Sequence, residues 1–166
     1  MPAGPVVANN SPLAALWAID QLDLLRQLFQ EIWIAPAVGE EFVAFAREER
    51  QRALAERPWI RIVPLRDQRP RLSVLGLDLG ETQTLALAAE NSASLVIMDE
   101  RKGRTAAQRM KLRLTGTVGI LLLAKDQDLL PAVGPWLIRL EEHGMRLGPG
   151  LIGRALQLAG ELPISG

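Results

Sequence analysis

Two groups of acidic residues lie about twenty residues apart in the middle of the chain, where one sheet edge could collect both. Asp78 and Glu81 stand at the start of a predicted helix, and Asp99 and Glu100 directly follow a short apolar run. A run of that length and composition is typical of a strand covered on both faces. Because open α/β sheets bind ligands at the carboxyl ends of their strands, the two groups are predicted to meet there. Such a site suits a hard cation.

Both groups also have an ordinary structural interpretation. Asp78 could cap the helix that Glu81 begins, since a carboxylate at a helix start accepts from exposed backbone N–H groups. Asp99 and Glu100 could form a solvated turn before a basic run. The decision between the two interpretations depends on whether other donors converge on the same edge.

Composition limits the function classes. The chain has 166 residues, enough for one domain with a core, and 48% hydrophobic with 23% charged residues is globular rather than disordered. There are no cysteines, which excludes disulfides, thiolate metal sites and cysteine nucleophiles. No signal peptide is visible and no apolar run approaches the ~18 residues that span a bilayer, so a cytoplasmic protein without membrane contact is expected. The net charge is +0, so nucleic acid would have to bind a local patch.

Apolar periodicity and breaker residues predict alternating strands and helices. Strands are expected at 6–8, 32–34, 59–63, 95–98 and 112–114. Helices are expected from an N-cap at Ser11, after Asp20, from Pro36 as one long helix to Arg57, and at 81–91, 105–111, 117–125, 129–143 and 149–160. This order predicts one α/β domain over residues 1–166 with a mainly parallel central sheet flanked by helices.

Further oxygen donors follow the other strands of this predicted sheet. Asn9 and Asn10 come directly after the first strand, and Glu40 and Glu41 lie a turn into the helix after the second. Together with the two acid groups they form an oxygen-rich set without histidine or cysteine, which suits Mg²⁺ or Mn²⁺ rather than zinc. Such a set supports phosphoryl hydrolysis, in which the ion activates a water and neutralises charge on the phosphate.

A basic run follows the second acid group. It comprises Arg101, Lys102, Arg104, Arg109, Lys111 and Arg113, of which the first four are the candidate nucleic-acid contacts. These side chains could hold a nucleic-acid backbone, and an ordinary solvated helix face explains them equally well. The single histidine, His143, is expected at the surface near a helix end, and no GxSxG, Walker-type or GxGxxG motif is present.

Five segments, in this order, resemble the PIN-domain family. They are VVANNSPLAALWAIDQLDLLRQLF, IAPAVGEEF, LGLDLGETQTLALAAE, LVIMDERKGRTAA and LTGTVGILLLAK, and they cover the chain from about Val6 to Gly160. More narrowly, they resemble a branch of predicted nucleic-acid-binding proteins of bacteria and archaea. The resemblance implies a PIN-like three-layer sandwich with a parallel sheet. It also implies kinship with ribonucleases that depend on magnesium or manganese, some of which are toxins of toxin–antitoxin pairs.

Carried over by position, the resemblance implies Glu41, Glu81 and Asp99 as the catalytic, metal-binding acids. Asn9 stands where most PIN nucleases carry aspartate, and its amide oxygen would be a neutral ligand. Residues expected to assist are Ser11, Asn10, Asp78 and Glu100.

Two functions are therefore expected. The first is a metal-dependent ribonuclease that uses a metal-bound water, with RNA or single-stranded nucleic acid as substrate and a small antitoxin as a partner if it is a toxin. The second is a non-catalytic PIN-like module for RNA or protein binding that lacks the full charge of the metal site. A homodimer is expected in either case, because the helices around Trp17 and 129–140 carry more large apolar side chains than one small domain needs.

Overall fold

A parallel β-sheet forms the centre of the protein in the computed structural model, which describes residues 4–67 and 76–162. Within these residues five short strands pair in the order β3-β2-β1-β4-β5, and every pairing is parallel. The strands are β1 (Val6–Ala8), β2 (Ile32–Ile34), β3 (Ile60–Ile62), β4 (Leu95–Ile97) and β5 (Leu114–Thr115). The central strands are apolar and buried because helices cover both faces, which confirms the predicted fold class.

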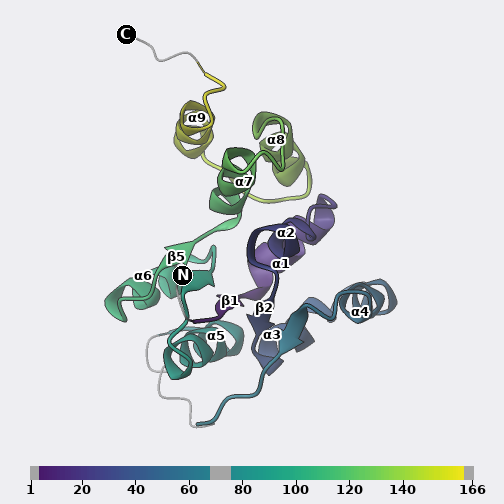
Figure 1. Ribbon diagram of the computed structural model, residues 1–166, viewed down its shortest axis with the longest axis vertical. Coiled ribbons are helices and arrows are strands. Elements are labelled where there is room, and N and C mark those ends of the chain that lie inside the picture. The colour runs from purple at the N-terminus through teal and green to yellow at the C-terminus, as the bar shows by residue number, and fades with distance from the viewer. Residues whose placement is uncertain (1–3, 68–75, 163–166) are drawn as a thin grey trace.

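Helices connect the strands and form the outer layers. Figure 1 shows α5 on one side of the sheet and α1, α2 and α7 on the other. The core includes Val7, Leu16, Ile34, Val96 and Leu121, all fully buried. The helices are α1 (Asn10–Ala18), α2 (Leu24–Phe29), α3 (Pro36–Phe42), α4 (Arg47–Ala55), α5 (Leu79–Glu90), α6 (Arg101–Arg109), α7 (Thr117–Asp126), α8 (Gly134–Glu142) and α9 (Pro149–Leu158).

The long helix predicted from Pro36 to Arg57 is wrong. The chain turns after Phe42, with Ala46 in the left-handed region at φ 46°, and α4 leaves in a new direction. The turn follows from burial, since Phe42 is fully buried whereas α4, which is rich in Arg and Glu, lies mostly at the surface. Arg50 on α4 donates to the Phe42 carbonyl, and its guanidinium lies 5.0 Å from the ring centroids of both Trp17 and Phe42.

Ser11 is not the N-cap that the sequence predicted. Helix α1 begins at Asn10, and Asn9 holds the extended N-cap conformation without a side-chain cap bond. The Ser11 hydroxyl instead donates to the Glu100 carboxylate at 2.8 Å, because the loop after β4 lies beside the start of α1.

Helix α6 begins four residues earlier than the predicted 105–111. Its first turn contains Arg101, Lys102 and Arg104, which precede the predicted helix, and Gly103 in that turn is buried. A Cβ at this glycine would overlap the Met98 sulfur, so only glycine lets the turn approach the sheet this closely. The predicted helix at 129–143 starts only at Gly134, because Pro131 and Pro135 cannot both occupy a helix interior. The predicted second helix starts at Leu24 after a left-handed Asp20.

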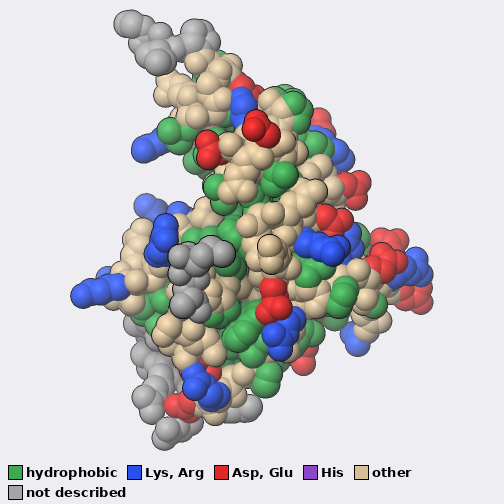
Figure 2. Space-filling model, viewed as in Figure 1, with side chains coloured by type: hydrophobic (Ala, Val, Ile, Leu, Met, Phe, Trp, Pro, Cys, Tyr) green, Lys and Arg blue, Asp and Glu red, His purple; other side chains and the backbone are tan. Residues whose placement is uncertain are grey.

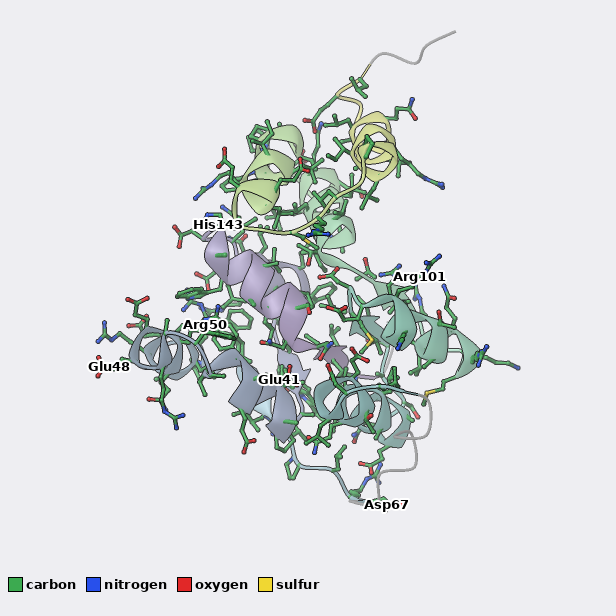
Figure 3. The ribbon with its side chains drawn as sticks, turned by 180° about the vertical axis from the view of Figure 1, so that it is seen from behind. Glu41, Glu48, Arg50, Asp67, Arg101 and His143 are labelled. Atoms are coloured by element: carbon green, nitrogen blue, oxygen red, sulfur yellow. The ribbon has the colours of Figure 1, made fainter. Side chains whose placement is uncertain are left out.

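Smaller shifts of one to three residues affect the other elements. Strand β5 is Leu114–Thr115 rather than 112–114, and the strand predicted at 59–63 is shorter by one residue at each end. The segment 64–72 is rich in Pro and Arg, which predicts an irregular loop, and part of it lies outside the described residues. His143 is exposed at the end of α8, as predicted (Figure 3). No helix in the described ranges is long and apolar enough to cross a bilayer.

Candidate metal and nucleic-acid site

The candidate residues gather at the topological switch point of the sheet. Strands β1 and β4 are neighbours, and the chain builds the sheet outward from them in opposite directions. Their carboxyl ends carry Asn9 and Asn10 on one side and Asp99 and Glu100 on the other. The Asn9 N–H continues the pairing by donating to the Ile97 carbonyl at 2.9 Å. A crevice outside such a switch point is where open α/β sheets bind ligands.

Glu41 enters this region from the last turn of α3. Helices α3 and α5 pack against each other, and the Gly80 backbone N–H at the start of α5 donates a hydrogen bond to the Glu41 carboxylate. A Cβ at position 80 would overlap that carboxylate. Figure 3 shows Glu41 at the centre of the molecule, between α3 and α5. The start of α5 therefore fixes a carboxylate that belongs to another helix.

Asp78 and Glu81 form a capping box at the start of α5. Asp78 Oδ1 accepts from the Glu81 N–H at 2.7 Å, and the Glu81 carboxylate accepts from the Asp78 N–H. The structural interpretation of Asp78 as a cap is therefore correct. It does not remove Glu81 from the candidate site, because the cap holds Glu81 in place with only 7% of the residue exposed.

Negative charge is crowded at this helix start. Burial and the neighbouring Asp78 raise the pKa of Glu41, against the lowering effect of the Gly80 N–H. Burial, Asp78 and, to a smaller extent, Glu100 raise the pKa of Glu81. Like charges close together disfavour ionisation, and a cation bound among them would relieve the repulsion.

Asp99 lies at the N-terminus of α7. Its Oδ1 accepts from the Thr117 N–H at 2.8 Å and its Oδ2 accepts from the Thr117 hydroxyl at 2.6 Å. A Cβ at Gly116 would stand only 2.6 Å from Oδ1. The turn before α7 is thus shaped around this carboxylate. It is no freely solvated turn, although each oxygen retains a second lone pair.

Thr117 is a residue that the sequence analysis did not select. It is fully buried and binds both oxygens of Asp99. The sequence did mark this position, since Gly116 and Thr117 stand at the start of an apolar helix, where threonine is favoured. The partner of that helix start was not readable, because Asp99 is eighteen residues away.

Two amide oxygens near the acids lack partners. Among the described residues, Asn9 Oδ1 and Asn10 Oδ1 are buried and accept no hydrogen bond. Asn9 is only 4% exposed. An unpaired buried carbonyl oxygen costs free energy, and a cation is one group that satisfies it. This observation and the crowded carboxylates both fit an ion with oxygen ligands.

The acids as they stand do not form a finished metal cage. Within residues 4–67 and 76–162, no three acidic or histidine side chains lie together in a metal-binding arrangement. Glu81 is engaged by the cap of α5, Asp99 by Thr117, and Glu100 by Ser11. An ion would therefore be held by carboxylates that already have protein partners, together with the amide oxygen of Asn9, which like that of Asn10 has none.

The predicted basic residues divide between two faces of α6. Arg101, Lys102 and Arg109 line a hollow of about 250 Å³ together with Thr105 (Arg101 is labelled in Figure 3). Arg104 points the other way, where its guanidinium donates to the Met98 carbonyl at 2.9 Å, beside Asp99. The structure thus separates Arg104 from the other three cations and brings it to the acids.

The fold and the site together define an α/β protein with a parallel sheet and an acidic, amide-lined switch point. A family model described as PIN domain matches residues 5–161, so the chain belongs to the PIN-domain family. This confirms the resemblance seen in the sequence, and nuclease-like chemistry is consistent with it. A search of curated protein sequences finds no match to the chain.

Proposed function

We propose that the protein is a metal-dependent ribonuclease that hydrolyses phosphodiester bonds at the switch point. The observation that carries this proposal is the crowding of Glu41, Asp78 and Glu81 at a strand edge where the Asn9 amide oxygen has no partner. Burial and the charge of Asp78 raise the pKa of both glutamates. Membership in the PIN-domain family supports nucleic acid as the substrate class.

The ligands of Mg²⁺ or Mn²⁺ would be Asn9, Glu41, Glu81 and Asp99. When bound, the ion supplies a more acidic attacking water and neutralises charge that grows on the phosphate. The chain's own contribution is positioning. Gly80 orients Glu41, the capping box orients Glu81, and Thr117 orients Asp99 through both carboxylate oxygens.

Proton transfer requires a carboxylate oxygen that the ion leaves free. Burial and the neighbouring Asp78 raise the pKa of Glu41 and Glu81 when no ion is bound, and a free oxygen of either carboxylate would take the proton of the attacking water. Asn9 cannot take this role, since its amide neither carries charge nor accepts a proton. The metal site has one negative charge fewer than a site with aspartate at this position.

Cleavage of a labelled structured RNA with Mn²⁺, Mg²⁺ or EDTA tests the proposal. The Glu81→Gln, Asp99→Asn double variant keeps side-chain size, and Glu48→Gln on the exposed face of α4 is the matched control (Figure 3). Cleavage that needs the ion, persists in the control and disappears in the double variant supports the proposal. Equal cleavage in all three proteins would identify a contaminating nuclease.

The hydrogen bonds that already engage the acids favour a second function, a binding module without catalysis. Glu81, Asp99 and Glu100 all have protein partners, and Asn9 reduces the charge. These features suit a non-catalytic module that binds RNA or protein. Metal-independent RNA binding without any cleavage would establish that alternative.

We further propose a homodimer in the cytoplasm, and a small antitoxin-like partner if the protein is a toxin. Ile138 on α8 is 60% exposed, which leaves an apolar side chain for an interface. A monomeric mass by light scattering would overturn the dimer. Growth arrest on expression, relieved by a protein encoded beside this chain, would support the toxin role.

A further inference from the structure

A groove opens on the other side of Asp99 from the capping box. It runs between the β5–α7 segment and the residues that lead into α9, and its volume is about 470 Å³. Figure 2 shows the hollow between the α7–α9 helices and α6, with Lys and Arg side chains on both of its sides. Asp99 and Arg104 lie at one end, so the groove adjoins the candidate site.

The floor of the groove is apolar. Its lining includes Val118, Leu122, Met145, Leu151 and Leu158. Leu151 and Leu158 are 46% and 68% exposed, although they are large aliphatic side chains on a folded helix. They stand seven residues apart on α9, a spacing that places both on one face of the helix. This face of α9 has no cover among the described residues.

Three arginines surround this apolar floor. Arg146 and Arg154 are exposed, and Arg104 is half-buried beside Asp99. In the part of the chain that the structure describes, none of the three forms an ion pair. Arg146 and Arg154 therefore stand beside the aliphatic side chains without an acidic partner in the described parts of the chain, whereas Arg104 lies next to Asp99 at the end of the groove. That combination is complementary to an anionic chain that also carries flat apolar groups.

We propose that this groove binds a single-stranded segment of RNA, with its phosphates on Arg146 and Arg154 and its bases against Leu151 and Leu158. The inference rests on the proposed function, because the groove leads to Asp99 and would deliver the strand to the acids. A single strand exposes the faces of its bases, whereas an A-form duplex stacks them inside and offers only its backbone and shallow groove. The aliphatic floor therefore selects the single strand.

Binding in EDTA tests the groove separately from catalysis. The probe is a fluorescein-labelled single-stranded RNA of mixed sequence, measured by anisotropy at several salt concentrations, beside the same RNA annealed to its complement. The Arg146→Glu, Arg154→Glu variant removes the two groove cations. Arg47→Glu, Arg52→Glu makes the same charge change on exposed positions of α4, on the side of the molecule away from the groove (Figure 1).

The groove variant is expected to bind the single strand at least about tenfold more weakly. Its plot of log affinity against log salt concentration should be less steep by about 1.4, because two phosphate contacts are lost. The α4 control is expected to keep the wild-type slope. Leu151→Ser, Leu158→Ser is expected to weaken binding severalfold at every salt concentration without changing the slope, since it removes base contacts and no charge. The duplex is expected to bind more weakly than the single strand.

Several results would overturn the inference. Equal losses in the two charge-reversed variants would mean that only net charge matters, and tighter binding of the duplex would exclude single-strand selection. Displacement of the RNA by a peptide of alternating glutamate and leucine, at a lower charge concentration than unlabelled RNA needs, would assign the groove to a protein segment. Ion-dependent cleavage that the groove variant retains in full would preserve the proposed function and remove the groove from it. If no protein cleaves RNA while the binding pattern is as expected, the groove inference stands and the proposed function is overturned.

Discussion

The Glu41 carboxylate occupies the space in which a side chain of residue 80 would begin. Gly80 also donates its backbone N–H to the same carboxylate. The position of the Glu41 carboxylate on α3 therefore depends on the absence of a side chain at Gly80 on α5. Without a glycine at position 80, α3 and α5 could still pack, but Glu41 would have to turn away from the acids.

Substitution of Gly80 by alanine is therefore expected to lower ion-dependent RNA cleavage by about 10²-fold, the order that small misplacements of catalytic groups cost. The displaced carboxylate, not unfolding, is the cause, so the protein should remain folded. Gly153→Ala is the control, since a Cβ there meets nothing and alanine favours the helix. Circular dichroism confirms the fold, and unchanged cleavage by Gly80→Ala would remove Glu41 from the site.

The crowded glutamates give a second prediction, which concerns stability without metal. A raised pKa of Glu41 means that the folded state binds the proton more tightly than the unfolded state does. The resulting stability is present below the ordinary carboxyl pKa and is lost as the pH rises through the raised value. In EDTA at pH 7, Glu41→Gln should therefore melt at a higher temperature than the wild type, and the difference should vanish in acid.

The same melting experiment tests the ion itself. Mn²⁺ should raise the melting temperature of the wild type, because a ligand that binds only the folded state stabilises it. The increase should be much smaller in Glu41→Gln and unchanged in Glu48→Gln. An equal increase in all three proteins would place the ion elsewhere.

Glu161 anchors the end of α9 to the start of α8. Its carboxylate accepts from the Val133 and Gly134 N–H groups and from Lys125 Nζ, and these bonds lower its pKa. The stability that this carboxylate contributes is present above the ordinary value of 4.5 and is lost as the pH falls through the lowered folded value. Glu161→Gln should reduce the free energy of unfolding at pH 7 by about 1–3 kcal/mol, as for hydrogen bonds to a charged group. Urea titration measures the loss, which should shrink toward pH 3.

Arg50 gives a stability prediction for the contact between α3 and α4. Its guanidinium lies over the rings of Trp17 and Phe42 and donates to the Phe42 carbonyl (Figure 3). Arg50→Ala should cost about 1–3 kcal/mol of unfolding free energy, from one hydrogen bond and two cation–π contacts. Arg47→Ala, on an exposed position of the same helix, should change it by less than about 0.5 kcal/mol. RNA cleavage by both variants should stay near the wild-type rate.

The sequence predicted the strands more reliably than the ends of the helices. Runs such as Ile32 to Ile34 are apolar, short and flanked by polar residues, and this local pattern determines where a buried parallel strand lies. The break between α3 and α4 has no such local signal. It depends on the burial of Phe42, which the packing of the whole chain determines, so periodicity alone extended the helix across the break.

The candidate site shows the same division. The convergence of Asn9 and Asp99 on one edge followed from strand order, since both come directly after neighbouring strands. The capping box of Asp78 and Glu81 was also readable from spacing. The contacts of Thr117 with Asp99 and of Arg154 with the groove were not, because they join segments whose packing only the folded chain defines.

The two bonds between Thr117 and Asp99 have a mechanical consequence. Asp99 ends the segment after β4, and Thr117 begins the helix from which the α7–α9 unit extends. A tilt of α7 would pull directly on this carboxylate, and a change of its ligands would loosen the first turn of α7. The orientation of the three C-terminal helices and the position of the Asp99 carboxylate are thus coupled, so that a movement of either displaces the other.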